Sequence, residues 1–548
     1  MGLSPMHRSS LLLGSLLLLD AGSPAQAQQR YDLLITGGTV LDGTGALGFP
    51  ADVLIQNGRV VRVSRERLSR DSARRVIDAA GLMVAPGFID LHAHIEGLTR
   101  MPDAESHVRQ GVTLAVGGPD GGGPSPFGTY LSRLDSLGLG MNVAFMTGHN
   151  TIRRIVMGLA NRKPSPEELH RMESMVAAAM HEGAFGLSTG LFYLPGTFSD
   201  LDEVVALSKV AADSGGFYTS HLRKEGLGLL DGVREAIEIG RQARIPIVLT
   251  HHKAVGPAMW GQSIATLALL DSARVSGIDV MADQYPYTAT STGLGALVPP
   301  WAAEGGDTAF ARRERDPVLR DSLVRGIVFN LENDRGGGDL RRVQFSQVSW
   351  NRSLEGRTLH DWVTERGLEP TPLNAAGLVI EGMLRGGAGM IYHVLDERDV
   401  ERIMRHPHTA IASDGSLSRP GMGVPHPRAY GTFPRVLGVY VRERGVLALE
   451  EAVRKMTSLP AARLGLTDRG RLAEGLVADI TIFDARTVKD LATFQAPHQY
   501  PVGIPWVIVG GVPVVDGGNF TAHRPGKVLR RPRSGTTNSG TNGLDPEP

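Results

Sequence analysis

The chain has 548 residues, of which 42% are hydrophobic and 21% are charged, with 57 basic and 57 acidic side chains. A formal net charge of zero and the lack of an extended basic face argue against a nucleic-acid partner. The sequence has no cysteine, which excludes disulfides, a thiolate nucleophile and cysteine metal ligands. The length indicates a large α/β unit with a smaller companion domain.

Residues 1–27 have the pattern of a secretory signal peptide. His7 and Arg8 precede the apolar run Leu11–Leu19, and Ala25-Gln26-Ala27 follows as a small-residue cleavage site. The apolar run is shorter than the roughly 20 residues that span a bilayer. We expect cleavage after Ala27 and a periplasmic or secreted protein without a stable membrane anchor. An uncleaved anchor is the alternative.

Both ends of the mature chain are rich in short β-type runs. Residues 31–84 alternate such runs with turns, and residues 465–520 contain two more, Gly475–Phe483 and Trp506–Asp516. We predict that the two ends pair into one β-sandwich. Residues 521–548 contain the basic run Lys527–Arg533 and a Ser, Gly, Thr and Asn-rich stretch, which predict a disordered, solvated tail.

Residues 85–464 alternate strand-like runs with helical patterns, which is typical of parallel βαβ units. Eight such units predict an α/β fold with a (β/α)₈ TIM-like barrel, whose active site lies at the carboxyl ends of the strands. An open doubly wound sheet is the alternative. About residues 290–400, between the seventh and eighth strands, we predict an inserted segment, because this stretch is too long for a loop. The expected strands are Phe88–His92, Val112–Gly117, Asn142–Thr147, Ala184–Thr189, Gly216–His221, Pro246–His251, Ile278–Asp283 and Thr409–Asp414.

The most informative motif is His92-Ala93-His94, at the end of the run VAPGFIDLHAH (84–94). Side chains alternate along a strand, so both imidazoles point the same way and reach one metal ion. Single histidines, His221 and His251, follow later expected strands, and Asp414 follows the last. Taken singly, His221 and His251 are more typical of ordinary strand-end histidines. Together, at the strand ends of one barrel, they predict a hydrolytic metal centre, with zinc as a suitable ion.

Asp414 is placed to act as the general base, accepting a proton from water and returning it to the leaving amine. The alternative for this residue, which Gly415 follows, is an Asx turn or a helix N-cap. His149 also follows an expected strand, in Gly148-His149-Asn150, where it either lines the pocket or has a structural role. Lys253 lies two residues beyond His251.

These residues resemble the amidohydrolase superfamily and, within it, the N-acyl-D-amino-acid deacylases, or D-aminoacylases. The run VAPGFIDLHAH and the strand-end His and Asp residues are general marks. The resemblance covers nearly the whole mature chain and implies zinc-dependent hydrolysis of N-acyl-D-amino acids to a carboxylate and a D-amino acid. More specific marks are GAFGLSTGLFYLPGTF (183–198), TSHLRKEG (219–226), THHKAVG (250–256), DQYPYTA (283–289) and SDGSLSRPGMGVPHPRAYGTFPRVLG (413–438).

The resemblance also implies roles for single residues. It implies that His221 and His251 hold a tightly bound zinc, that His92 and His94 contribute to a second, weaker metal position, and that Asp414 is the general acid and base.

Three further positions, Lys253, Tyr287 and Arg428, match those that face the substrate carboxylate in such deacylases. Arg428 suits this role because its planar guanidinium can bind a carboxylate through two hydrogen bonds.

The chain departs from the family pattern at two places. Many superfamily members carry a carboxylated lysine after the fourth strand, but Gly186–Thr189 offers none. Deacylases of this type tend to use a cysteine after the second strand, where this chain has Gly117-Gly118-Pro119-Asp120-Gly121. Asp120 is the nearest replacement ligand, or else an ordinary residue of a Gly-rich turn. The number of zinc ions per chain, one or two, therefore stays open, as does the oligomeric state.

Two other functions compete with deacylation of this small-molecule substrate. One is hydrolysis of a cyclic amide or a dipeptide, as in dihydropyrimidinase-like or dipeptidase-like relatives, although a cyclic imide would not need Lys253, Tyr287 and Arg428. The other is a non-catalytic exported binding protein, against which the presence of Asp414 and all the histidines argues.

Overall fold

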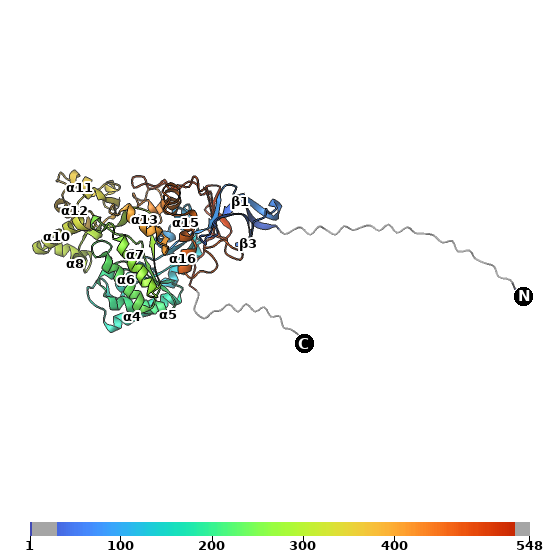
Figure 1. Ribbon diagram of the computed structural model, residues 1–548. Helices are drawn as coiled ribbons and strands as arrows, with labels where there is room; N and C mark the ends of the chain where they lie inside the picture. Colours follow the sequence, from blue (N-terminus) through green and yellow to red (C-terminus); the bar gives the residue numbers. More distant parts are fainter. Residues whose placement is uncertain (3–29, 532–548) are drawn as a thin grey trace.

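The computed structural model describes residues 1–2 and 30–531. Apart from its first two residues, the expected signal peptide lies outside the described ranges. In Figure 1 a β-rich part carrying β1 and β3 lies at one end of the molecule, and α10, α11 and α12 lie at the other, with the remaining labelled helices between them. Within the described ranges, no helix is both long and apolar enough to cross a membrane.

A nine-stranded sheet joins the two ends of the chain. The first half contributes β1 (Tyr31–Val40), β2 (Phe49–Gln56), β3 (Arg59–Ser64), β4 (Ala73–Asp78) and β5 (Met83–Pro86), and the second contributes β20 (Ile480–Phe483), β21 (Trp506–Val509), β22 (Val512–Asp516) and β23 (Asn519–Phe520). The halves meet where β5 pairs antiparallel with β20, Val84 opposite Ile482. Buried aliphatic residues of both halves share one core. This confirms the β-sandwich predicted from both ends.

Eight parallel strand positions form the barrel, as predicted. Hydrogen bonding links β6-β8-β9 and β10-β11-β12-β13-β14-β18. Two short extensions, β7 and β19, pair in parallel with Ala93 opposite Gly415, which joins the last strand position to the first. The strands are β6 (Phe88–Asp90) with β7 (Ala93–His94), β8 (Val112–Gly117), β9 (Asn142–Phe145) with β10 (Thr147–Gly148), β11 (Gly186–Gly190), β12 (Phe217–His221), β13 (Ile247–Leu249), β14 (Val280–Gln284), and β18 (Thr409–Ile411) with β19 (Gly415–Ser416).

Alternation along the strands builds two apolar layers. In β13, Val248 belongs to a cluster drawn almost entirely from barrel strands, whereas its neighbours Ile247 and Leu249 belong to the core shared with the surrounding helices. The surrounding helices are α1 (Glu105–Val108), α2 (Phe127–Leu137), α3 (His149–Met157), α4 (Pro166–His181), α5 (Leu201–Asp213), α6 (Leu229–Ala243), α7 (Ser263–Val275), α13 (Glu397–Arg405), α14 (Arg428–Arg435), α15 (Leu449–Met456) and α16 (Ser458–Arg463), with a π-helical segment at Val436–Glu443.

The inserted segment has a core of its own. It contains an antiparallel sheet of β15 (Thr290–Gly293), β17 (Gly389–Tyr392) and β16 (Val343–Gln347), together with α8 (Pro300–Ala303), α9 (Asp307–Arg315), α10 (Pro317–Asn333), α11 (Leu359–Glu365) and α12 (Pro372–Leu384). Its buried apolar residues, such as Leu323, Phe345 and Trp362, form a cluster separate from that of the barrel. The chain returns to the barrel with α13, which contacts β18.

The prediction of a disordered tail over residues 521–548 is wrong for residues 521–531. Residues 521–531 instead lie along the barrel, where the backbone N–H of Val143 donates to the carbonyl of Lys527 at 2.9 Å and the N–H of Leu529 donates to the carbonyl of Val143 at 2.7 Å. Val528 is 8% exposed. Composition favoured a solvated tail, but these backbone hydrogen bonds and the buried valine hold the segment in place. Residues 532–548 lie outside the described ranges.

Candidate metal centre and active site

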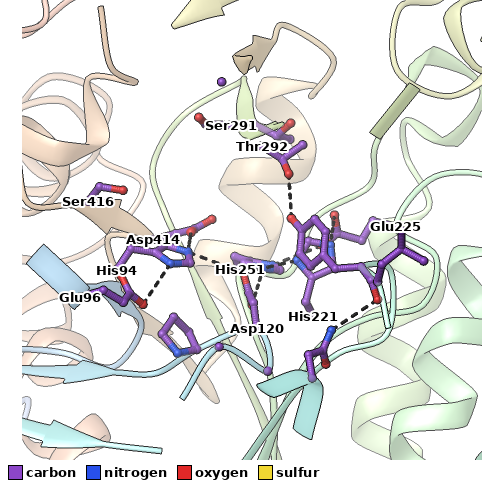
Figure 2. A pocket seen from close by; sticks show the side chains of 18 of the residues that line it. His94, Glu96, Asp120, His221, Glu225, His251, Ser291, Thr292, Asp414 and Ser416 are labelled. Atoms are coloured by element: carbon purple, nitrogen blue, oxygen red, sulfur yellow. Dashed lines mark hydrogen bonds and ion pairs between the residues drawn. The ribbon is translucent and has the colours of Figure 1, made fainter. Parts of the chain in front are cut away.

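The four predicted histidines and Asp414 meet at the carboxyl ends of the barrel strands. Figure 2 shows His94 and Asp414 on one side of Asp120, and His221 on the other. His92 and His94 follow β6, His221 ends β12 and His251 follows β13. Barrel closure therefore brings together the strand-end residues that the sequence predicted.

Asp120 connects two groups of potential ligand atoms. Its Oδ1 lies 3.6 Å from His92 Nε2 and its Oδ2 lies 3.6 Å from His94 Nε2, on the side of Asp414. Its Oδ1 also lies 3.3 Å from His251 Nε2, and its Oδ2 lies 3.6 Å from His221 Nδ1. One cluster contains His92, His94, Asp120 and Asp414, and the other contains Asp120, His221 and His251. The site thus has two adjacent donor sets with one shared carboxylate.

These donor sets fit zinc. Ligand atoms about 2.0–2.1 Å from a tetrahedral zinc lie about 3.3 Å from one another, and the separations here are 3.2–3.6 Å. Among the described residues, three of the ring nitrogens that face Asp120 are buried without a hydrogen-bond partner: His92 Nε2, His221 Nδ1 and His251 Nε2. Leaving such atoms unpaired is costly, and coordination of a cation removes that cost.

The backbone around Asp120 is constrained on both sides. Asp120 has a left-handed φ of 53°, which is uncommon for a residue with a side chain. The Ser188 hydroxyl, from β11, donates to the carbonyl of Gly118 at 2.6 Å and accepts from the N–H of Gly121 at 3.2 Å. A Cβ on Gly121 would lie 2.1 Å from Asn150 Oδ1. Asp120 is therefore both a Gly-rich turn residue and a potential ligand, so the two sequence-based alternatives are compatible.

Glu225 orients the two histidines on the far side of the site. Its Oε2 lies 3.3 Å from His221 Nε2, and its Oε1 lies 3.2 Å from His251 Nδ1. Both rings therefore turn their other nitrogen toward Asp120, as metal-binding histidines with a carboxylate partner do. Sequence reasoning missed Glu225, although it lies in TSHLRKEG, four residues after His221.

Lys253 lines the cavity but is already engaged. Its ammonium pairs with Glu225 at 2.5 Å and donates to the His251 carbonyl at 2.8 Å, and it lies 2.7 Å from His251 Nδ1. These contacts tie it to the histidine side of the site. Lys253 therefore lies at the cavity wall with its ammonium on Glu225 and His251, and its contact with a substrate carboxylate stays a prediction.

Asp414 and Arg428 form a buried ion pair. Arg428 Nη1 lies 2.7 Å from Asp414 Oδ2, and both side chains are 7% exposed. Burial raises the pKa of Asp414, but the charges of Arg428 and His251 outweigh it and hold the pKa well below its usual range. Asp414 is thus ionised and able to accept a proton. The second amino group of Arg428 makes only a 3.4 Å contact with the Ser291 carbonyl, so it keeps donor capacity toward the cavity.

The structure places two of the predicted substrate-binding residues outside the cavity. Tyr287 is buried beside Arg435, whose guanidinium lies 4.9 Å from its ring, and Tyr285 lines the cavity instead. Arg428 stacks 4.8 Å over the Tyr285 ring. His149 is fully buried, and its Nε2 lies 2.8 Å from Glu203. The sequence left open whether His149 lines the pocket or has a structural role. Its burial and its contact with Glu203 favour the structural role.

The site opens into a cavity of about 610 Å³ between the barrel loops and the inserted segment. Its walls include Asn150 and Arg154 of α3, Tyr193 after β11, and Ser291 and Thr292 of β15. Such a volume suits a small organic molecule. His94, His221, His251, Asp120 and Asp414 are among its lining residues, so the cavity exposes the potential metal ligands to a bound molecule.

Comparison with known proteins gives consistent matches. A model of the amidohydrolase family matches residues 75–259 and 357–515, and the unmatched stretch between them falls largely in the inserted segment. The chain is 38% identical to an N-acyl-D-glutamate deacylase of Alcaligenes xylosoxydans xylosoxydans, over 92% of this chain and 98% of that protein.

Two solved structures superpose with a TM-score of 0.78 over 92% of this chain and 100% of theirs. One, 34% identical, is an N-acyl-D-glutamate deacylase from Bordetella bronchiseptica in complex with zinc and a phosphonate inhibitor that mimics the tetrahedral intermediate. The other, 35% identical, is a D-aminoacylase with a binuclear metal centre, described as activated by one metal and attenuated by the second.

Proposed function

Since this chain belongs to the amidohydrolase family, we propose that it hydrolyses the amide bond of N-acyl-D-amino acids, releasing a carboxylate and a free D-amino acid, with zinc at its metal centre. The observation that carries the proposal is one shared carboxylate, Asp120, between two sets of histidines, beside the ion pair of Asp414 and Arg428. The N-acyl-D-amino-acid substrates and the zinc of the similar proteins support it.

His221, His251 and Asp120 would hold one zinc ion, and His92, His94 and Asp120, beside Asp414, would hold a second. Zinc supplies an activated water for attack and polarises a carbonyl group. The protein contributes the orientation of the rings, through Glu225. Because the histidines come from three strand ends and Asp120 from a fourth, the donor atoms already converge and little reorganisation is needed on binding.

Asp414 performs the proton transfers. As a carboxylate held ionised beside Arg428, it accepts a proton from the attacking water and delivers it to the departing amine nitrogen. The amide C–N bond breaks, the acyl group leaves as a carboxylate, and the D-amino acid leaves with the transferred proton. One group thus acts first as base and then as acid.

Arg428 binds the α-carboxylate of the substrate. Its Nη2 donates toward the cavity while Nη1 stays on Asp414, and the aromatic face of Tyr285 supports the guanidinium plane. This places the amino-acid half of the substrate on the Asp414 side of the metal centre. Binding of the α-carboxylate by Arg428 favours a linear N-acyl amino acid over a cyclic imide, because a cyclic imide has no carboxylate.

The test is a hydrolysis screen with zinc-loaded protein against N-acetyl-D- and N-acetyl-L-amino acids, with a hydantoin and a dihydropyrimidine alongside. We expect turnover of D-enantiomers with free amino acid as product. Turnover confined to the cyclic amides, or to L-enantiomers, would overturn the proposal.

We also propose that the protein is exported, which the N-terminal pattern at residues 1–27 supports. Fractionation of expressing cells followed by N-terminal sequencing is expected to find a periplasmic or secreted protein that begins at Gln28. A cytoplasmic protein that retains Met1 would contradict this.

A further inference from the structure

Three of the residues that meet at the metal centre have a left-handed backbone. Asp120, His251 and Asp414, which lie close together in Figure 2, have φ angles of 53°, 37° and 49°. Residues with a side chain adopt this region rarely, because Cβ crowds the backbone there, so the conformation persists only where surrounding contacts hold it. The contacts that hold these turns therefore decide where the donor atoms point.

The turn at His251 is held by Asp283. Asp283 lies on β14, the strand next to β13, and its Oδ1 accepts a hydrogen bond from the N–H of His251 at 2.5 Å. The Asp283 carbonyl also accepts from the N–H of His252 at 2.7 Å. The Asp283 side chain is fully buried, and within the described residues its Oδ2 has no hydrogen-bond partner. This buried carboxyl group therefore contacts the backbone of a potential metal ligand and little else that is polar.

The turn at Asp414 is held by Asp90, across the seam that closes the barrel. Asp90 lies on β6, the first barrel strand, whereas Ser413 and Asp414 follow β18, the last. Asp90 Oδ1 accepts from the N–H of Ser413 at 2.8 Å and from the N–H of His92 at 3.3 Å. The N–H of Asp414 in turn donates to the His92 carbonyl at 2.8 Å. One carboxyl oxygen thus fixes the backbone on both sides of the seam.

Stability alone does not account for these two aspartates. Asp90 is also fully buried, and its Oδ2 lies 3.9 Å from Nε2 of the buried His107, where both atoms lack a hydrogen-bond partner. In the part of the chain that the structure describes, neither Asp90 nor Asp283 pairs with a lysine or an arginine. A buried carboxyl group without a cationic partner costs stability, so a role in the metal centre is the better explanation.

We propose that Asp283 and Asp90 are positioning residues with separate tasks. Asp283 holds the His251 ring in place and so sets the zinc affinity of the donor set that contains it. Asp90 holds Asp414 in place and so sets the rate of proton transfer. Each needs an acceptor oxygen at Oδ1 and not a negative charge. The part about zinc affinity is independent of the substrate, whereas the part about the rate rests on the proposed function.

The first experiment measures two quantities for Asp283→Ala and Asp90→Ala. These are the zinc affinity, by chelator competition, and kcat for N-acetyl-D-leucine at the zinc concentration that gives each variant its highest rate. Asp283→Ala is expected to weaken zinc affinity about tenfold or more, and added zinc restores its kcat. Asp90→Ala is expected to lower kcat about tenfold or more at every zinc concentration, because a small displacement of the base is enough to slow proton transfer. Its KM is expected to stay near that of the wild type.

Asparagine variants separate the acceptor from the charge. Asp283→Asn and Asp90→Asn keep an oxygen that can accept from the same N–H but remove the carboxylate. We expect both to retain zinc affinity and kcat near the wild-type values. An asparagine variant as defective as the alanine variant would show that the charge is what matters, and would overturn the proposal. Should an alanine variant not fold, the leucine variant, which restores buried volume without an acceptor, takes its place.

Asp52→Ala is the matched control. Asp52, on β2 of the β-sandwich, is 1% exposed and accepts from the N–H groups of Gly37 at 3.0 Å and Leu68 at 2.9 Å. It is therefore a buried carboxylate that holds backbone outside the metal centre. We expect its loss to lower thermal stability and to leave zinc affinity and kcat unchanged.

The outcomes distinguish the two proposals. If Asp283→Ala and Asp90→Ala behave like Asp52→Ala, both aspartates are merely structural and the positioning roles are refuted. If zinc restores the kcat of Asp90→Ala, or fails to restore that of Asp283→Ala, the separation of tasks is wrong. If the wild type turns over no acylated D-amino acid, the proposed function fails, and the zinc affinity of Asp283→Ala still decides on the role of Asp283.

Discussion

Replacing Arg428 by Met tests whether the active site recognises a carboxylate. The substitution keeps most of the apolar stem but removes the guanidinium, which now spans Asp414, at 2.7 Å, and the open cavity. If Nη2 binds the substrate carboxylate, losing this charged hydrogen bond costs about 1.5–3 kcal/mol. That corresponds to a fall in kcat/KM of about 10- to 150-fold for an N-acyl-D-amino acid.

A second effect of the substitution must be separated from the first. Arg428 also helps to keep Asp414 ionised, so its loss raises the pKa of Asp414 and moves the acid limb of kcat/KM to higher pH. This loss is the same for every substrate. Comparing each N-acyl-D-amino acid with the analogue whose α-carboxylate is a primary amide therefore isolates the carboxylate contact.

The assay measures kcat/KM for both substrates with the wild type, Arg428→Met and Arg435→Met, at a pH above the acid limb. Arg435 is a suitable control, because it lies on the same helix, pairs with Asp490 at 3.2 Å and stacks over Tyr287. The large fall in kcat/KM caused by Arg428→Met should be absent with the amide substrate. Arg435→Met should change kcat/KM for both substrates alike. Equal losses on both substrates for Arg428→Met would refute carboxylate recognition by this residue.

The remaining predictions concern the metal centre and the buried network behind it. Asp414→Asn should lower kcat roughly 10²–10⁴-fold even after zinc is restored; near-normal turnover would place the base elsewhere. Chelation should abolish turnover, and Asp120→Asn should reduce zinc content by elemental analysis, with a wild-type count near two if Asp120 bridges and near one if it does not. Glu225→Gln should weaken zinc affinity about 10–100-fold in a chelator competition, because two ligand rings lose their carboxylate partner. His149→Ala should lower thermal stability, by about 1–3 kcal/mol, and leave KM unchanged; a raised KM would return His149 to the substrate site.

Local pattern alone was sufficient to predict the scaffold of the site. Alternation along a strand places His92 and His94 on one side, and eight βαβ units favour closure into a barrel whose strand ends meet. Alternation acts over a short stretch of sequence, and the succession of strands and helices repeats along the chain, so both can be recognised without knowledge of side-chain contacts. The same rules brought His221, His251 and Asp414 to one edge without any knowledge of their contacts.

Other features depended on contacts between distant segments. Tyr285 and Tyr287 stand two residues apart, and only packing against Arg428 and Arg435 decides which of them lines the cavity. His149 begins α3 at a strand end as expected, yet its ring faces Glu203, 54 residues further on. No local rule gives the direction of such loop and helix-start side chains.

The sequence by itself predicted the barrel, the β-sandwich and the histidine ligands from residue type and spacing. It predicted the family, and Asp120 as a further potential ligand, from the resemblance of its motifs. The tertiary structure alone decided that Asp120 is shared by both donor sets, because its left-handed backbone is held by Ser188, about 70 residues away. It also decided that Asp90, on the first barrel strand, holds the end of the last one, because its Oδ1 accepts from the N–H of Ser413, 323 residues further on. Such contacts form between segments whose separation in sequence carries no periodic signal, and only the folded chain brings those segments together.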